Sequence, residues 1–142
     1  IFFVQDNLSK SKKNTLRGMH YQLPPMTQGK LVSVLEGEIF DVVVDLRSSS
    51  KTFGDFLCQK LNSETKQQLW VPEGFAHGFL VISDFAEVMY KTTNFYNPNL
   101  ERSIIWNDSD LSINWPNHSN ILLSDKDKKA SSFLGADFFS EL

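Results

Sequence analysis

The chain has 142 residues, of which 41% are hydrophobic and 22% are charged, and its formal net charge at pH 7 is −3. This is the length of one domain with a core of its own, and the balance of residues excludes a collagen-like or disordered chain. The slight negative charge argues against a nucleic-acid binder, and the sequence has no apolar run of membrane-spanning length and no signal peptide.

The chain opens with the apolar run Ile1–Val4, which has the composition of a strand interior. From this abrupt beginning we expect residues 1–142 to be a single domain that lacks an N-terminal segment.

The next strand-like stretch is "LRGMHYQ", Leu16–Gln22. Simple alternation places Gly18, His20 and Gln22 on one face, with Arg17, Met19 and Tyr21 on the other. A histidine at such a place is about as often a satisfied structural residue as a functional one, so both interpretations of His20 stay open.

The longest period-two pattern is "KLVSVLEGEIFDVVVDLR", from Lys30 to Arg47. The glycine at position 37 marks a tight turn, so we predict a hairpin here. Phe40, Val42, Val44 and Leu46 share one face, and Asp41, Val43, Asp45 and Arg47 the other. Lys30 shares a face with Val32 and Val34. Such a lysine is usually a surface residue with a buried stem, but it can also place a positive charge beside an oxyanion.

Two further strands are expected in 56–61 and 67–71, on either side of a polar loop. The only cysteine, Cys58, lies in the first of them. A single thiol makes no disulfide within the chain, and no activating partner is near it, so a small buried or half-buried side chain is expected. A reducing cytoplasm is the expected compartment.

Strands are also predicted at 78–83 and 86–96, separated by a short break. If His77 opens the first, it shares a face with Phe79 and Val81. In the second, Tyr90 shares a face with Val88, either as a core tyrosine or as a proton donor that points into a cavity.

Past residue 100, turn signals become frequent, and His118 follows "WPN" in a loop that we expect to be solvated. Ser124 and Asp127 then have the spacing of a helix N-terminal capping box, which predicts a short helix. On this reasoning alone, Asp127 is a capping residue.

The many short strands with turns between them predict an all-β sandwich or barrel with a short helical C-terminal segment. Small β-barrels often bind metals through clustered histidines, but the sequence has neither HxH nor HxxxH, so we predict no metal site.

Taken together, "FVQDN", "LRGMHYQ", "LWVPEGFAHGF", "YKTTNFY", "IIWND" and "LSDKD" occur in an order and at spacings that resemble the dTDP-4-dehydrorhamnose 3,5-epimerases. The resemblance covers nearly the whole chain. It implies a cupin-type jelly-roll β-barrel and a cytoplasmic, homodimeric enzyme of L-rhamnose biosynthesis. Such an enzyme epimerises a dTDP-4-keto-6-deoxy sugar at C3 and C5 without a metal or other cofactor, and without nucleic-acid or membrane partners.

The resemblance also implies roles for individual residues. His20 would be the base, Asp127 would orient it, Tyr90 would donate a proton from the opposite face, and Lys30 would stabilise the enolate oxygen. The residues expected to line the substrate pocket are Gln5, Asn7, Arg17 and His77.

Three other functions stay open at this point. A relative with the same catalytic residues could epimerise at one carbon only. A non-catalytic barrel that binds sugar nucleotides, or is merely structural, is a second possibility, and a metal-dependent cupin oxygenase is a distant third.

Overall fold

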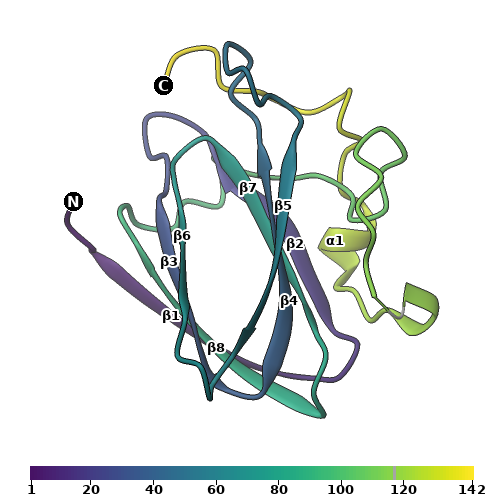
Figure 1. The fold of residues 1–142 in the computed structure, drawn as a ribbon. Coiled ribbons are helices and arrows are strands. Elements are labelled where there is room, and N and C mark those ends of the chain that lie inside the picture. Colours follow the sequence, from purple (N-terminus) through teal and green to yellow (C-terminus); the bar gives the residue numbers. More distant parts are fainter. Residues whose placement is uncertain (117) are drawn as a thin grey trace.

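The computed structural model describes residues 1–116 and 118–142, and of His118 it describes only the backbone. Two antiparallel sheets face each other and enclose the interior (Figure 1). The four-stranded sheet has the order β1-β8-β3-β6, and the five-stranded sheet has the order β5-β4-β7-β2-β9. The strands are β1 (Gln5–Lys12), β2 (Leu16–Gln22), β3 (Lys30–Glu36), β4 (Glu38–Asp45), β5 (Phe56–Asn62), β6 (Gln68–Val71), β7 (Phe75–Val81), β8 (Phe85–Thr92) and β9 (Glu101–Ser103), and the short helices are η1 (His118–Asn120) and α1 (Asp125–Lys128).

This architecture confirms the predicted all-β class with a short helix near the C-terminus. The first strand begins at Gln5, so the apolar run Ile1–Val4 lies outside it and is exposed. Among the described residues, no helix is long and apolar enough to cross a membrane.

Consecutive strands almost always lie in different sheets. Among the described strands, only β4 and β5 follow each other along the chain within one sheet. The predicted hairpin across Gly37 is therefore wrong, because β3 pairs with β6 and β8, whereas β4 pairs with β5 and β7. Gly37 has a φ of +82°, and a Cβ there would lie 2.1 Å from the Phe85 carbonyl oxygen. Gly37 does form a turn, as predicted, but this turn carries the chain from one sheet to the other.

The barrel interior is filled where the inward rows of the two sheets meet. Val32 and Val34 of β3 face Ile39 and Val43 of β4 across the interior, with Phe79 of β7 beside them. In a hairpin these rows would lie side by side, and the crossing at Gly37 places them opposite each other instead.

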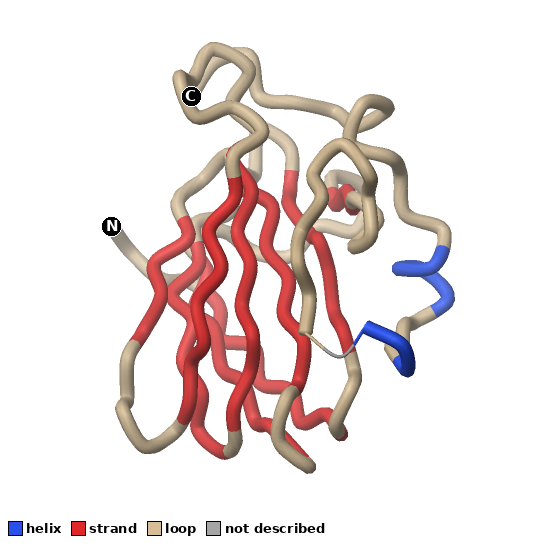
Figure 2. Tube along the Cα trace, turned by 45° about the vertical axis from the view of Figure 1, so that its right-hand side comes forward, coloured by secondary structure: helices blue, strands red, loops and turns tan. Residues whose placement is uncertain are grey.

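A second apolar core covers the outer face of the five-stranded sheet. The row of β4 that holds Val42 and Val44, which was predicted to share one face, packs there against the segment 104–139. Figure 2 shows this segment lying over the sheet, with its loops and the two short helices. Its largest buried side chains in this core are Trp115, Phe133 and Phe139.

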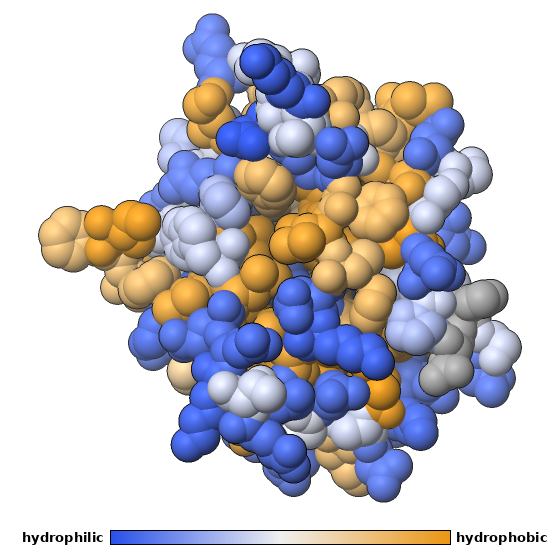
Figure 3. Space-filling model, viewed as in Figure 1, coloured by the Kyte–Doolittle hydropathy of each residue, from blue (hydrophilic) through white to orange (hydrophobic). Residues whose placement is uncertain are grey.

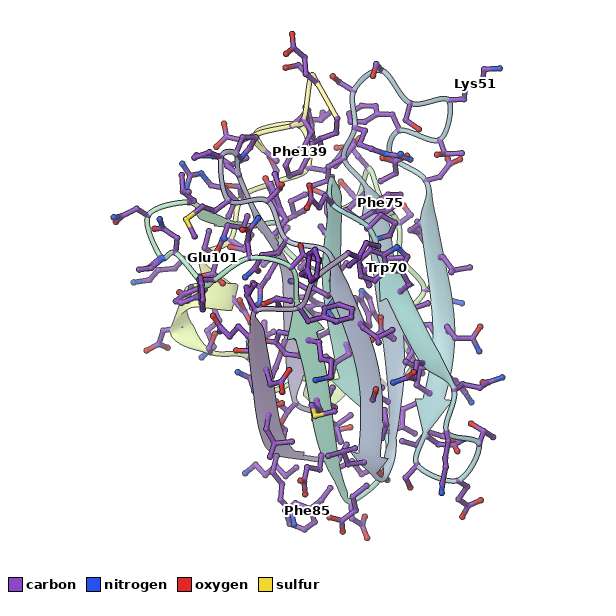
Figure 4. The ribbon with its side chains drawn as sticks, turned by 90° about the vertical axis from the view of Figure 1, so that its left-hand side faces the viewer. Lys51, Trp70, Phe75, Phe85, Glu101 and Phe139 are labelled. Atoms are coloured by element: carbon purple, nitrogen blue, oxygen red, sulfur yellow. The ribbon has the colours of Figure 1, made fainter. Side chains whose placement is uncertain are left out.

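The outer face of the four-stranded sheet has no such cover among the described residues. Figure 4 looks onto this side, where Trp70 of β6 is labelled. Leu8 of β1, Leu35 of β3 and Trp70 are all exposed. Apolar surface also surrounds the projecting N-terminus in Figure 3, and Phe3 contacts Trp70 edge to face, with ring centroids 6.3 Å apart.

Candidate active site

A small cavity lies between the two sheets, and most of its walls are polar or charged. Residues of both sheets line it: Ser9, Arg17, His20, Lys30, His77, Phe79 and Tyr90. A larger groove of about 650 Å³ is lined by the end of β1, by β2 and by α1, and it shares Arg17 and His20 with the cavity. Lys12 and Lys126 add two further cations to this groove.

His20 and Asp127 form a close pair at the boundary between cavity and groove. The Nε2 atom of His20 lies 2.6 Å from Oδ1 of Asp127, and Oδ2 of Asp127 accepts a hydrogen bond from the backbone N–H of Gly18 at 3.2 Å. Burial alone would raise the pKa of Asp127, but the hydrogen bonds and charge around it, mainly from His20, bring it below its ordinary value. The carboxylate is therefore held ionised beside the imidazole, and Nδ1 is the ring nitrogen that remains for proton transfer.

Asp127 is both a helix residue and the partner of His20. Ser124 is the N-cap of α1, and its Oγ accepts a hydrogen bond from the backbone N–H of Asp127 at 3.1 Å. The Asp127 carboxylate turns across to β2 instead of completing the capping box. The capping interpretation thus described the backbone of Asp127 correctly and missed its side chain.

Lys30 and Tyr90 face this pair from the four-stranded sheet. Lys30 is buried, which decides against a surface lysine, and its Nζ lies 5.8 Å from the centroid of the Tyr90 ring. Burial lowers the pKa of Lys30 to about 8, although the negative charges of Glu101 and Asp41 act to raise it. Burial raises the pKa of Tyr90, so the phenol keeps its proton at neutral pH.

Arg17 reaches the same cavity as His20, although simple alternation placed the two on opposite faces. The register between β2 and β7 shifts between Arg17 and His20, so the strand bulges there. Gly18 has a φ of +134°, and a Cβ on it would lie 2.5 Å from the Cα of Gly78. Only the placement of Arg17 from simple alternation was wrong, because the bulge at Gly18 interrupts the period-two pattern, and the expectation from the family resemblance had already put Arg17 in the pocket.

His77 lines the cavity from β7, on the same face as Phe79, as predicted. Its Nε2 lies 2.8 Å from Oδ2 of Asp41, and both side chains are buried. Burial raises the pKa of Asp41, although the charge of His77 and its hydrogen bond act in the opposite direction. The other carboxylate oxygen of Asp41 is buried without a hydrogen-bond partner among the described residues.

Gln5 and Asn7 lie on the inward face of β1, toward the end near Tyr96. Gln5 donates from Nε2 to Oδ1 of Asn7 at 2.9 Å and accepts a hydrogen bond from the backbone N–H of Tyr96. Asn7 is paired directly with Tyr90 across β1 and β8. Neither residue lines the small cavity itself, so their role in binding substrate stays a prediction.

The family of the chain follows from comparison with known proteins. The sequence model of the dTDP-4-dehydrorhamnose 3,5-epimerases matches residues 1–134. The chain belongs to this family. A relative named dTDP-4-dehydrorhamnose 3,5-epimerase from Shigella flexneri is 58% identical over 137 residues, which are 96% of this chain and 75% of the relative. Another of the same name from Pseudomonas aeruginosa is 52% identical and covers 98% of this chain and 76% of its own length.

Solved structures of the epimerase family agree with the fold. The dTDP-6-deoxy-D-glucose-3,5-epimerase of Legionella pneumophila, in complex with dTDP-4-keto-L-rhamnose, superposes with a TM-score of 0.95 at 48% identity over 99% of this chain and 76% of that one. A 3'-monoepimerase from Streptomyces bikiniensis, in complex with dTDP-quinovose, has a TM-score of 0.87 at 34% identity over 93% of this chain and 67% of that one.

The predicted catalytic residues of this epimerase-family chain all meet at one place. His20, Lys30 and Tyr90 line the cavity, and Asp127 contacts His20 from behind. Sequence reasoning missed Ser9 and Phe79 as cavity residues, and it missed Asp41 as the partner of His77. Asp41 carried a usable signal, because it is an acidic residue between Ile39 and Val43 in the inward row of a buried strand. The structure describes only the backbone of His118, so the expectation that it is solvated lies outside the described residues.

Proposed function

We propose that the protein epimerises dTDP-4-dehydro-6-deoxy-D-glucose at C3 and C5 and so forms dTDP-4-dehydro-L-rhamnose. The observation that carries the proposal is the His20–Asp127 pair, 2.6 Å apart, which faces Lys30 and Tyr90 across one cavity. A base on one wall and an acid on the other are what inversion at carbon requires.

The C4 ketone makes the hydrogens on C3 and C5 acidic, because loss of either gives an enolate. Nδ1 of His20 accepts the proton from carbon, and the electron pair moves to the C4 oxygen. Asp127 holds the ring through Nε2 and stabilises the imidazolium that forms.

Lys30 stabilises the enolate oxygen. In the barrel interior a positive charge acts on a developing oxyanion more strongly than it would in water. With a pKa of about 8, most Lys30 side chains carry this charge at neutral pH.

Tyr90 donates its proton to the opposite face of the same carbon, which inverts it and leaves a phenolate. The imidazolium of His20 then loses its proton and the phenolate regains one through exchange with solvent. Each inversion in D₂O therefore places one deuterium on the carbon that reacted.

Arg17, His77, Gln5 and Asn7 are proposed to bind the substrate. Two of them line the cavity, and the other two lie on the inward face of β1. The diphosphate is proposed to lie in the groove against α1, where Lys12 and Lys126 join Arg17 as cations.

The test is incubation with the 4-keto substrate in D₂O, followed by NMR of C3 and C5. Uptake at both carbons supports the 3,5-epimerase, whereas uptake at C3 or C5 alone identifies a single-carbon epimerase. A folded protein that binds the nucleotide sugar without any exchange would be a binding barrel, and the proposed activity would be wrong.

We also propose a homodimer formed through the outer face of the four-stranded sheet, where Leu8, Leu35 and Trp70 are exposed. Sheets that pack face to face bury such rows against each other. Sedimentation should give a dimer that Leu8→Lys dissociates, whereas Leu134→Lys, at an exposed leucine in the C-terminal segment, leaves it intact. A monomer at all concentrations would contradict this.

The expected compartment remains the cytoplasm, proposed from the unpaired Cys58.

A further inference from the structure

The cavity contains a polar atom that no described residue satisfies. Oγ of Ser9 is buried and has no hydrogen-bond partner in the part of the chain that the structure describes. Buried hydroxyl groups in folded proteins nearly always have a partner, so an unpaired one that lines a cavity beside five proposed substrate groups points to a ligand. The mechanism proposed above does not use it.

The strand register gives the position of Ser9 relative to Tyr90 and Lys30. Ser9 is paired with Val88 of β8, and Lys30 of β3 is paired with Thr92 of the same strand. Tyr90 lies between Val88 and Thr92 on their common inward face. Ser9 and Lys30 therefore approach the cavity from opposite sides of Tyr90, and Ser9 meets a different part of a bound sugar from the part that Lys30 contacts.

The chemistry of the wall narrows the choice of ligand group. Arg17 and Lys30 only donate hydrogen bonds, whereas a serine hydroxyl both donates and accepts, as the hydroxyl groups of a hexose do. With the C4 oxygen at Lys30, the ring hydroxyls available are those on C3 and C2. The C2 hydroxyl lies further from the C4 oxygen, which matches the place of Ser9.

We propose that Ser9 binds the C2 hydroxyl of the hexose and thereby sets the ring between His20 and Tyr90. This inference rests on the proposed epimerase function. It makes Ser9 a determinant of substrate specificity, because a sugar without that hydroxyl offers the serine no partner at this position.

The test compares the wild type and Ser9→Ala on two substrates, dTDP-4-keto-6-deoxyglucose and its 2-deoxy analogue, by deuterium uptake in D₂O. With the full substrate, Ser9→Ala should lower kcat/KM by about 5- to 30-fold. With the 2-deoxy analogue the two proteins should differ less than about twofold, because the partner hydroxyl is already missing.

Thermal unfolding separates this role from a structural one. Alanine removes a buried hydroxyl that has no partner, so Ser9→Ala should melt at the same temperature as the wild type or higher. The control is Ser132→Ala in the exposed C-terminal segment, where Oγ accepts a hydrogen bond from the backbone N–H of Gly135, and it should leave kcat/KM unchanged.

Equal kcat/KM values for Ser9→Ala and the wild type, or the same loss on both substrates, would overturn the inference. A wild type that exchanges no deuterium would instead refute the epimerase proposal. The two failures are therefore distinguishable.

Discussion

Two histidine–aspartate pairs border the cavity, and their surroundings give them different properties. In the pair of His20 and Asp127 the side chains are 25% and 3% exposed, and the carboxylate has a second donor, the backbone N–H of Gly18. In the pair of His77 and Asp41 they are 5% and 0% exposed, and one carboxylate oxygen has no partner among the described residues.

These surroundings shift the pKa values of the two carboxyl groups in opposite directions. The pKa of Asp127 lies below its ordinary value and that of Asp41 above it. A short histidine–aspartate contact therefore does not by itself make a catalytic pair. The pair also needs enough hydrogen bonds to hold the carboxylate charge, and enough exposure for the imidazole to exchange protons with solvent.

The largest expected effect separates the two histidines. His20→Asn removes the proposed base and should lower kcat by about 10³-fold or more, while the fold is kept. His77→Asn removes a proposed substrate contact and should cost about tenfold, mainly in KM. Steady-state kinetics with circular dichroism as the folding control checks both. Equal losses in the two variants would remove the distinction between the pairs.

The next effect concerns Asp127. Asp127→Asn keeps the shape of the side chain but removes the charge that stabilises the imidazolium, so kcat should fall by about 10²- to 10³-fold. The matched variant Asp41→Asn should retain most of kcat, because Asp41 acts on a residue that takes no proton from carbon. If Asp41→Asn lost more activity than Asp127→Asn, the base would belong to the pair of His77 and Asp41 instead.

The pH dependence of the rate tests the role of Lys30, which faces the pair of His20 and Asp127. The kcat/KM of the wild type should fall as pH rises through about 8, where Lys30 loses the proton that stabilises the enolate. Lys30→Met should lower kcat by about 10²-fold and remove this alkaline decline. Rate profiles between neutral and alkaline pH measure both effects. An unchanged decline in Lys30→Met would assign it to another group.

The smallest effect is on stability, and it has opposite signs for the two aspartates. The folded-state pKa of Asp127 is lowered, so its contribution is present above the unfolded-state pKa and is lost as pH falls through the folded-state pKa. The folded-state pKa of Asp41 is raised, so its contribution is present at low pH and is lost as pH rises through that value.

Urea unfolding should be measured between the unfolded-state and folded-state pKa values of each carboxyl group. The free energy of unfolding should change there by about 1–2 kcal/mol per unit of pKa shift. Relative to the wild type, Asp127→Asn should lose the increase in stability with rising pH, and Asp41→Asn should lose the decrease. If both variants changed the profile in the same direction, the two carboxyl groups would not differ as described.

Much of the fold could be predicted from alternation alone, because each buried strand has one row of side chains on each face. The faces of Val42 and Val43, and of Tyr90 with Val88, were assigned correctly. The hairpin at Gly37 was not, since a turn residue reports the local φ and carries no information about which strand pairs with which.

The site was predictable to a smaller extent. Asp127 could be placed beside His20 only through the family resemblance, because 107 residues separate them and no periodic pattern links them. Arg17 was misplaced because a bulge shifts the register by an amount that the sequence does not state. The sequence did not single out Ser9, since a serine that alternates with exposed residues occurs in many strands at the edge of a sheet.

The helix that carries Asp127 has only four residues, far fewer than an isolated helix needs in water. Its position depends on contacts with β2 made across most of the chain. The strands themselves pair almost entirely with distant partners, a topology of high contact order that is expected to fold in milliseconds to seconds. During refolding, then, catalysis would return only when the C-terminal segment docks on β2, so the recovery of deuterium exchange would report that docking.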